Sequence, residues 1–493
     1  MNQASLQLTD LLEGMVAQIP PCVLVNKISM DSRKIGNGDV FVALKGTTSH
    51  GTQYIDAAIN NGASAVLVDS SVPVNESQYS IPVIKLKDIK LKLATLGDRV
   101  YVDPSANLTL IAVTGTNGKT TCAHLIAQAL NRLSVSTAII GTVGQGLINN
   151  LAPSSLTTPD LFELRRLLAE FAQIGVEVVA FEASSHGLEQ GRLDELKLDM
   201  AVFTNLSHDH LDYHQDFLAY ARAKLKLFQF RGLRKAVMNA DQPLVDDFAS
   251  QTTAREIWLY GKSQTADVRL TEVKSLPNGL HITVKTRQGL YQFQSRLIGR
   301  INVENLLAVF TSLMAYGFEE SSIVKVLPDL VSVPGRMEVF GGDKAMPMVI
   351  VDYAHTPDAL EKALLSIRDH LQGRLICVFG CGGDRDKNKR PKMGKVAEVN
   401  ADLRVITDDN PRHENPADII AEIVSGMTSS GTTKGTRIIS DRPEAIKWAI
   451  EQANEKDIVL VAGKGHEATQ QIADKFIEMS DRALVSQLLG GAR

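Results

Sequence analysis

The chain has 493 residues, too many for one hydrophobic core, and a prior of one domain per ~150 residues predicts about three domains. Its 44% hydrophobic and 22% charged residues are ordinary for a soluble globular protein, and a net charge of -4 argues against a general nucleic-acid binder. No apolar run of about 18 residues is present, and the start "MNQASLQLTDLLEGMV" lacks a signal-peptide pattern. We therefore expect a cytoplasmic protein without membrane insertion.

The chain has four cysteines: Cys22, Cys122, Cys377 and Cys381. Two of them lie in strand-like apolar runs, which predicts reduced and mostly buried thiols. Because the last two do not form a CxxC pair, we expect neither a redox centre nor a zinc site there.

The predicted elements change in character along the chain. The first ~90 residues alternate short apolar runs with turns: "DVFVALKG", "ASAVLVDS" and "IPVIKLKD". From Leu108 the pattern is strand, glycine-rich loop and helix, and further strand-like runs follow at "STAIIGTVG", "VEVVAFEASS", "MAVFTNLS" and "KAVMNAD". This alternation predicts a mostly parallel sheet covered by helices.

A more alternating, strand-rich piece at about 265–300 precedes "INVENLLAVFTSLMAYG", whose spacing is helical. The Gly- and Pro-rich segment 331–347 then resembles a linker, and a second α/β series begins after it. We expect an α/β protein with domains at 1–90, 91–335 and 336–493. Polar, glycine-bearing clusters follow many of the strand-like runs, and facing carboxyl edges of two such sheets would form an interdomain site.

A phosphate-binding loop is predicted at "VTGTNGKTT", Val113–Thr121, between a strand and a helix. Gly115 and Gly118 let backbone N–H groups approach an anion, and the helix N-terminus adds a favourable dipole. Lys119 would reach the terminal phosphates, and Thr120 can offer a hydroxyl to Mg²⁺. The spacing is not a strict Walker A motif, and the alternative is a bare turn before a helix.

A metal region is predicted where Glu182 of "FEASSHG" ends one strand and "NLSHDHLDYH" follows another. The second stretch gathers His208, Asp209, His210, Asp212 and His214. No cysteine is nearby, whereas the ATP-binding loop is. Magnesium bound by oxygen atoms is therefore favoured over zinc. A polar turn that opens a helix is the alternative.

The stretch "VITDDNPRHENP" places two acids and an arginine around a proline, just after a strand-like run. A phosphate alone calls for basic groups and a metal alone calls for acids, whereas a zwitterion calls for both. Arg412 can bind a carboxylate with both arms of its guanidinium. By itself the stretch could also be an Asx-Pro turn with a surface arginine.

Taken together, the motifs resemble those of the Mur ligase family. "TGTNGKTT", "EASSHGL", "NLSHDHLDYH", "GRMEVF", "DYAHTPDAL", "GCGGDRD" and "AGKGHE" occur in that family's order along the whole chain. The resemblance implies an N-terminal α/β UDP-sugar domain, a central P-loop ATPase domain with a parallel sheet, and a C-terminal Rossmann-like α/β domain. It also implies a monomer whose partners are small-molecule substrates.

The implied reaction is the ATP-dependent addition of meso-diaminopimelate to the D-Glu carboxylate of UDP-MurNAc-L-Ala-D-Glu through an acyl phosphate, in peptidoglycan synthesis. A lysine-adding ligase and a folylpolyglutamate synthase-like ligase are alternatives within the same chemistry. A P-loop protein that uses ATP only as a conformational switch is an alternative from another class, but it leaves "GGDRD", "DNPR" and "GKGHE" without a role.

The resemblance implies site residues at the positions of this chain that match the family's motifs. For ATP these are Gly115, Thr116, Asn117, Gly118, Lys119, Thr120, Thr121, Asn302, Arg336 and Asp352. For the UDP-MurNAc-dipeptide they are Met30, Ser32, Thr47, Thr48, Ser49, Thr157, Thr158, Ser184, Gln190 and Arg192. For meso-diaminopimelate they are Arg385, Asp409, Asn410, Pro411, Arg412, Gly463 and Glu467.

The implied catalytic group is Lys119, Lys224, Glu182 and His210, with Mg²⁺ held by Thr120, Glu182, His210 and Lys224. In the family the lysine equivalent to Lys224 is carboxylated by CO₂, and a carbamate can bind Mg²⁺ where an ammonium would repel it. By itself Lys224 would be a solvated helix lysine.

Overall fold

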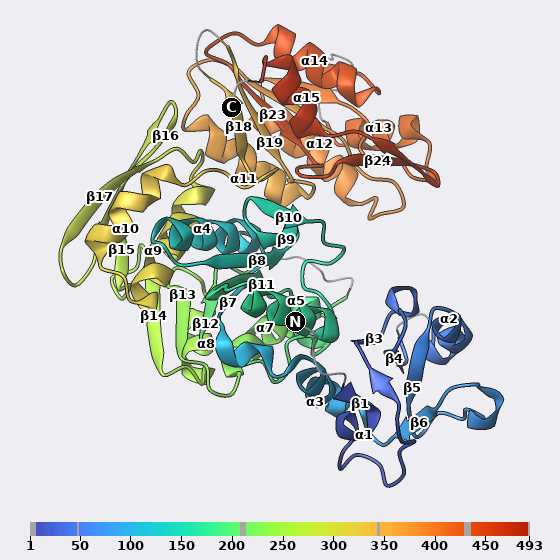
Figure 1. Ribbon diagram of the computed structural model, residues 1–493. Coiled ribbons are helices and arrows are strands. Elements are labelled where there is room, and N and C mark those ends of the chain that lie inside the picture. Colours follow the sequence, from blue (N-terminus) through green and yellow to red (C-terminus); the bar gives the residue numbers. More distant parts are fainter. Residues whose placement is uncertain (1–5, 47–48, 208–212, 343–345, 428–434, 492–493) are drawn as a thin grey trace.

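The computed structural model describes residues 6–46, 49–207, 213–342, 346–427 and 435–491 (Figure 1). It contains three α/β units in chain order, each built on its own main sheet. In the view of Figure 1 the C-terminal unit lies above the central one, and the N-terminal unit lies at its lower right. The expected α/β class with three units is thus observed.

The N-terminal unit has a four-stranded parallel sheet in the order β3-β4-β5-β6. Its strands are Ile28–Ser29, Asp39–Ala43, Ala63–Asp69 and Val83–Leu86, and a two-stranded sheet pairs β1 (Leu6–Gln7) with β2 (Leu24–Val25). Its helices are α1 (Leu8–Leu11), α2 (Ile55–Asn60) and α3 (Ile89–Tyr101). The core under α3 also takes Leu161 and Phe162 from the central unit. The expected boundary at residue 90 falls inside α3, and the domain bounds remain a prediction.

The central sheet has eleven strands in the order β10-β9-β8-β11-β7-β12-β13-β14-β15-β16-β17. Strands β8, β11, β7, β12, β13, β14 and β15 run parallel, and antiparallel hairpins extend both edges. The inner strands are continuous apolar runs because helices cover both faces.

Strands β7 to β17 of this sheet are, in chain order, Thr109–Thr114, Thr137–Gly141, Gly144–Leu147, Asn150–Ala152, Val178–Glu182, Met200–Phe203, Lys235–Asn239, Glu256–Gly261, Val268–Leu276, Gly279–Lys285 and Leu290–Ser295. Its helices α4 to α10 are Lys119–Arg132, Leu161–Gln173, Ser185–Glu189, Phe217–Leu225, Val245–Gln251, Ile301–Tyr316 and Glu320–Val326. Helices α4 and α9 pack on one face, and α5 and α8 pack on the other.

The C-terminal sheet has the order β18-β19-β23-β20-β21-β22, and only the edge strand β18 is antiparallel. Its strands are Glu338–Gly341, Met348–Asp352, Ile458–Ala462, Leu375–Phe379, Leu403–Ile406 and Thr436–Ile438. Helices α11 to α15 are Pro357–Arg368, Lys389–Asn400, Pro416–Ser425, Arg442–Gln452 and Asp481–Leu488. A separate hairpin pairs β24 (Thr469–Ile472) with β25 (Lys475–Glu478).

The prediction of a linker at 331–347 is partly wrong, because β18 lies inside this segment and joins the C-terminal sheet. The alternating residues Glu338 and Phe340 of this strand are buried, which a Gly- and Pro-rich composition conceals. The four cysteines are unpaired, and all but Cys22 are buried. Burial raises the pKa of the Cys377 thiol to about 12. Across the described ranges, no helix has both the length and the apolarity needed to cross a membrane.

Candidate active site

The phosphate loop joins β7 to α4 and depends on two glycines. Gly115 has φ +150°, and a Cβ there would lie 1.9 Å from the Thr204 hydroxyl. Gly118 has φ +86°, and a Cβ there would lie 2.6 Å from the Asn305 side-chain oxygen. Both positions need glycine for backbone conformation and for space. The Thr116 and Asn117 amides of the loop donate to Asn205, at 2.8 and 2.9 Å, and the loop ends at the N-terminus of α4, where a helix favours an anion.

Two lysines converge on this loop. Lys119 Nζ donates to the carbonyls of Gly115 and Thr116, each at 2.9 Å. Lys224 Nζ donates to the same Gly115 carbonyl at 2.8 Å and lies 4.4 Å from the centre of the Tyr220 ring. Lys224 is only 1% exposed, so it is not the solvated lysine that its helix position alone would suggest. The two ammonium groups concentrate positive charge where an anion would meet the loop.

A group of oxygen atoms lies beside the loop, because β11 is the neighbour of β7 in the sheet. Glu182, at the end of β11, accepts hydrogen bonds from the Thr120 hydroxyl at 2.9 Å and from the Thr142 amide at 2.6 Å. A carboxylate and a hydroxyl are hard oxygen ligands of the kind that Mg²⁺ takes. His210, the third expected ligand, lies outside the described residues, as do His208, Asp209 and Asp212.

Within the described part of the chain, no group of three or more His, Cys, Asp or Glu side chains is arranged to hold a metal ion. His214, the described histidine of "NLSHDHLDYH", is buried, and its Nε2 lies 3.0 Å from the Ser185 hydroxyl. A zinc site that includes His214 is therefore not supported.

A cavity of about 280 Å³ opens next to the phosphate loop. Lys119 and Lys224 line it, and its other lining residues include Thr157, Thr158, Ser184, Arg192 and His186 of α6. The Thr158 hydroxyl donates to the Glu182 carbonyl at 2.7 Å, and Arg192 Nη1 donates to the Thr158 carbonyl at 2.5 Å. The expected peptide-binding residues thus lie against the expected phosphate-binding ones.

A second cavity, of about 120 Å³, lies between the central and C-terminal units. It is lined by Asn117, Gly118, Thr121 and Asn302 from the central unit and by Arg336, Asp352, Tyr353 and His355 from the C-terminal part. The Arg336 guanidinium lies 4.4 Å from the centre of the Tyr353 ring. Burial raises the pKa of Asp352, although Arg336 and the amides of Met337 and Ala354 favour its ionised form.

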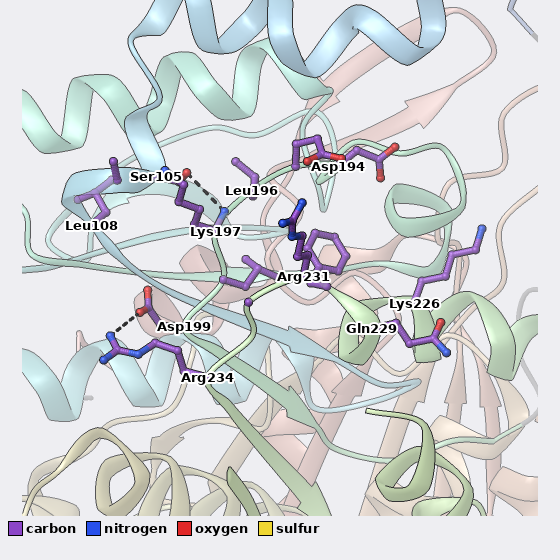
Figure 2. A pocket seen from close by; sticks show the side chains of 15 residues that line it. Ser105, Leu108, Asp194, Leu196, Lys197, Asp199, Lys226, Gln229, Arg231 and Arg234 are labelled. Atoms are coloured by element: carbon purple, nitrogen blue, oxygen red, sulfur yellow. Dashed lines mark hydrogen bonds and ion pairs between the residues drawn. The ribbon is translucent and has the colours of Figure 1, made fainter. Parts of the chain in front are cut away.

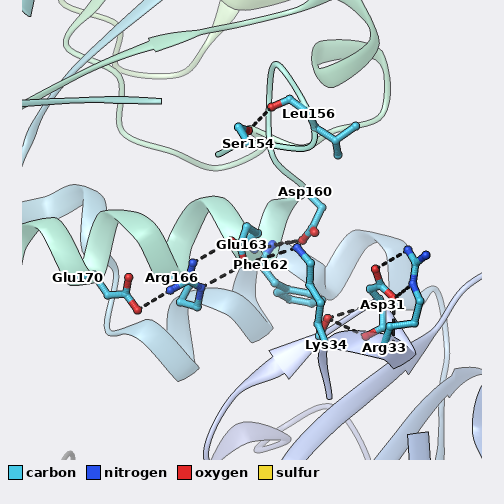
Figure 3. A network of polar contacts seen from close by, with 11 residues as sticks. Asp31, Arg33, Lys34, Ser154, Leu156, Asp160, Phe162, Glu163, Arg166 and Glu170 are labelled. Carbon is cyan, nitrogen blue, oxygen red and sulfur yellow. Dashed lines mark hydrogen bonds and ion pairs between the residues drawn. The ribbon is translucent and has the colours of Figure 1, made fainter. Parts of the chain in front are cut away.

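The expected UDP-sugar residues of the N-terminal unit lie apart from these cavities. Met30 and Ser32 flank Asp31, which binds Arg33 through both carboxylate oxygens (Figure 3). Lys34 lies 4.0 Å from Glu163 of α5 and so connects this unit to the central one (Figure 3). Ser49 accepts from the Tyr54 hydroxyl at 3.3 Å, whereas Thr47 and Thr48 lie outside the described residues. Gln190 is exposed and bonds to Arg192.

The expected amino-acid pocket lies at the carboxyl edge of the C-terminal sheet. Asp409–Arg412 follow β21, Arg385 follows β20, and Gly463 and Glu467 follow β23, and these three strands are neighbours in the order β23-β20-β21. Asp409 and Asn410 are buried, and Arg385 is exposed at the rim. The three motifs therefore lie at one edge of the sheet, and their binding of the amino acid stays a prediction.

Arg412 is held on both sides. Its φ is +50°, an unusual conformation for a residue other than glycine. Arg412 N donates to the Gln471 carbonyl at 3.1 Å, and Ala473 N donates to the Arg412 carbonyl at 2.7 Å, so the β24–β25 hairpin supports the loop. Its Nη1 donates to the Gly383 carbonyl at 2.7 Å. The guanidinium is thereby positioned with most of its N–H donors still available.

Sequence reasoning missed three charged residues that support this pocket. Lys464 lies between Gly463 and Glu467 and is fully buried. Arg442 and Asp481 form a fully buried ion pair at 2.7 Å, and Arg442 also donates to the carbonyls of Asp408 and Ala462, in the segments that precede the pocket. Lys464 could have been found from "GKGHE" itself, whereas no local pattern indicates the Arg442–Asp481 pair.

Another cavity, of about 960 Å³, lies elsewhere (Figure 2). It is at the amino ends of β7, β12 and β13, the opposite edge from the phosphate loop. Several of its charged residues form ion pairs: Lys226 with Glu189 at 2.9 Å, and Arg234 with Asp199 at 3.2 Å. None of the expected site residues lines it. The phosphate-loop edge, not this cavity, is the candidate active site.

Comparisons with known proteins agree with this architecture. Three family models match in chain order: Mur ligase family, catalytic domain at 24–101; Mur ligase middle domain at 113–313; and Mur ligase, glutamate ligase domain at 335–465. A UDP-N-acetylmuramoyl-L-alanyl-D-glutamate–2,6-diaminopimelate ligase of Coxiella burnetii is 41% identical over 96% of this chain and 97% of its own. One of Xanthomonas campestris is 43% identical over 95% and 94%.

Solved structures give the same result. One of a UDP-N-acetylmuramoyl-L-alanyl-D-glutamate–2,6-diaminopimelate ligase has a TM-score of 0.71 and 36% identity, and it covers 99% of both chains. The structure of MurF from Acinetobacter baumannii has a TM-score of 0.64 at 20% identity, a likeness of fold alone. On these matches, with the three sheets and the phosphate loop in the expected order, the chain belongs to the Mur ligase family.

Proposed function

We propose that this protein is an ATP-dependent ligase that joins diaminopimelate, in its meso form, to the D-Glu carboxylate of UDP-MurNAc-L-Ala-D-Glu. One observation carries the proposal: Lys119 of the phosphate loop lines the same cavity as Thr157, Thr158 and Arg192. A phosphate donor and an anionic acceptor can therefore meet at one wall. The 36–43% identical relatives named for this reaction, matched over nearly the whole chain, support the choice of substrates.

The first step brings two anions together, which is its main barrier. A D-Glu carboxylate oxygen attacks the γ-phosphorus of ATP, the bond from that phosphorus to the bridging oxygen breaks, and ADP leaves. Lys119 is placed to neutralise the phosphate, and Arg192 is placed to hold the carboxylate. The nucleoside would occupy the interdomain cavity near Asn302, Arg336 and Asp352. The product is an acyl phosphate.

In the second step the diaminopimelate amine attacks the acyl carbon. The tetrahedral intermediate collapses to an amide, phosphate leaves with the electrons of the C–O bond, and the amine loses its proton. The C-terminal pocket holds the far end of the amino acid, with Arg412 facing its carboxylate and Glu467 facing its ammonium. Closure of the C-terminal unit over the central one would align the amine and exclude water.

Mg²⁺ fits the oxygen atoms next to the loop. The Thr120 hydroxyl and the Glu182 carboxylate are 2.9 Å apart, and Glu182 is buried, so a divalent cation would relieve a desolvated negative charge there. We propose Thr120, Glu182 and His210 as its ligands. When bound, the ion supplies charge neutralisation at the phosphates.

Lys224 fits this group only in a modified form. As an ammonium 2.8 Å from the Gly115 carbonyl, it adds a positive charge and would repel a divalent cation. As a carbamate it would add anionic oxygens to the Thr120–Glu182 pair. We propose the carbamate, and intact-protein mass under non-acidic conditions with ¹³CO₂ tests it. An unmodified Lys224 in fully active enzyme would contradict it.

The acyl phosphate can be tested with a dipeptide substrate whose D-Glu γ-carboxylate carries ¹⁸O in both oxygens. One labelled oxygen becomes the bridging oxygen and leaves in the phosphate, whereas the other stays in the amide. We expect one ¹⁸O per phosphate released, measured by mass spectrometry. Unlabelled phosphate together with amide product would contradict the mechanism.

A further inference from the structure

Lys464 is a fully buried lysine in the wall of the amino-acid pocket, and it does not touch the phosphate site. Its ammonium donates to Asn410 Oδ1 at 3.2 Å, to Glu467 Oε2 at 3.0 Å and to the Thr469 carbonyl at 2.7 Å. An ammonium without water is costly unless all its protons are used, and here three acceptors use them. Such a complete set fixes the positions of the acceptors as well as that of the lysine.

The Asn410 side chain can hold only one of its two amide orientations in this setting. Its Oδ1 accepts from Lys464 and from the Gln471 amide at 2.9 Å, and its Nδ2 donates to Glu467 Oε2 at 3.0 Å. Turning the amide over would set an NH₂ group against two donors and an oxygen against a carboxylate. Lys464 and the Gln471 amide together therefore decide which end of Asn410 faces the pocket.

The Glu467 carboxylate is also oriented by these bonds. Both Lys464 and Asn410 bind its Oε2, and neither uses Oε1. The Glu467 side chain keeps 33% of its surface exposed, so the carboxylate remains open to a ligand. Lys464 thus binds one oxygen and leaves the other for a cation.

The anion-binding group of the pocket takes no direct bond from Lys464. Arg412 is fixed by the Gly383 carbonyl and by the β24–β25 hairpin, and Lys464 touches that hairpin only at the Thr469 carbonyl. The pocket therefore has a cation-binding side that Lys464 contacts directly and an anion-binding side held by other groups. A carbon atom that carries both an ammonium and a carboxylate must match the two sides at once.

On this basis we propose that Lys464 is a positioning residue that sets the stereochemical selectivity of the pocket for the far end of diaminopimelate. The inference rests on the proposed function. Inverting the far stereocentre changes the directions of its ammonium and carboxylate relative to each other, so only one configuration reaches both Glu467 and Arg412. If Lys464 is lost, Asn410 Oδ1 and Glu467 Oε2 each lose one of their two donors. Both side chains are then held less firmly, and the pocket accepts both configurations more equally.

The test compares wild type with Lys464→Met, which keeps the length of the side chain and removes its charge. We expect the KM for meso-diaminopimelate to rise roughly 10- to 100-fold, from the loss of charge-assisted hydrogen bonds. The ratio of kcat/KM for the meso isomer over the L,L isomer should fall towards one, while the KM for ATP stays unchanged. Lys456→Met, at an exposed lysine of the same unit, is the matched control and should keep the wild-type ratio.

A purely structural role for Lys464 gives a different result. It would reduce the fraction of active enzyme, so kcat would fall equally for both isomers while the KM values and the ratio stayed the same, and this outcome would overturn the proposal. Lys464→Gln is the second variant, because its polar end is better tolerated in the fold, whereas its two N–H groups and lack of charge cannot serve all three acceptors of Lys464. If only Lys464→Gln folds by circular dichroism, a wild-type ratio in it overturns the proposal equally.

Failure of the proposed function is distinguishable from failure of this inference. Wild-type protein that releases no phosphate with diaminopimelate would contradict the function itself. Active wild-type protein, with an unchanged isomer ratio in the Lys464 variants, would contradict only the positioning role.

Discussion

Arg412→Ala should remove recognition of the far carboxylate of diaminopimelate and leave the rest of the enzyme intact. Alanine also has a Cβ, so the strain of φ +50° is similar in both proteins, and the hairpin bonds at residue 412 come from the backbone. The carboxylate would lose the guanidinium that Gly383 positions at 2.7 Å. The substitution therefore tests a side-chain contact rather than the fold of the loop.

Truncating one partner of a hydrogen-bonded charge pair at this half-buried site should cost about 2–4 kcal/mol. This corresponds to a fall of roughly 30- to 900-fold in kcat/KM for diaminopimelate. L-Lysine has no far carboxylate, so its much lower kcat/KM should change by less than roughly threefold. Arg412→Lys should give an intermediate loss, because an ammonium keeps the charge but cannot bind with two arms.

The assay is phosphate release with saturating ATP and UDP-MurNAc-L-Ala-D-Glu, in which diaminopimelate and then L-lysine are varied. Arg437→Ala, at an exposed arginine on the edge strand β22, is the matched control and should behave as wild type. Equal proportional losses for diaminopimelate and lysine in Arg412→Ala would show damage to the pocket as a whole and would rule out a specific contact between Arg412 and the far carboxylate.

Three further predictions concern the loop, the buried pair and pH. Gly115→Ala should raise the KM for ATP, because φ +150° costs alanine about 1–3 kcal/mol and its Cβ has no room; Gly175→Ala, at φ +79° with open space around it, should keep the wild-type KM. Asp481→Asn should lower the free energy of unfolding by about 3–5 kcal/mol, because it leaves Arg442 buried without its counter-ion, whereas the double variant Arg442→Met/Asp481→Leu should lose much less in urea unfolding. Burial and Asp441 raise the pKa of Asp408 to about 6, above its ordinary 3.8. The folded state then holds a proton that the unfolded state has released, so this group should weaken stability as pH rises from about 4 to 6. Asp408→Asn should remove that loss, and equal melting-temperature profiles for variant and wild type from pH 4 to 7 would contradict it.

The sequence predicted the sheets and the loops at their carboxyl ends well, because each depends on a local pattern. The phosphate loop follows from Gly115 and Gly118 between an apolar run and a helix, and β20, β21 and β23 bring their motifs together as parallel neighbours must. Strand β18 was missed, because pairing with β19 decides its structure and the local composition does not.

The residues that hold the site in place could not be predicted from local patterns. The hydrogen bond from Lys224 to Gly115 connects residues more than a hundred positions apart in the sequence, and so do the contacts of α5 with the core of the N-terminal unit. The Arg442–Asp481 pair likewise depends on the packing of α14 against α15. Such contacts are properties of the tertiary structure, and one sequence without the fold carries no local signal for them.

Phosphate release from ATP by wild-type protein, measured with each substrate left out in turn, separates ligation from simple ATP hydrolysis. We expect release only when UDP-MurNAc-L-Ala-D-Glu and diaminopimelate are both present, with one amide formed per phosphate. Equal release without the amino acid or without the nucleotide dipeptide would contradict it, because ATP would then be hydrolysed without ligation.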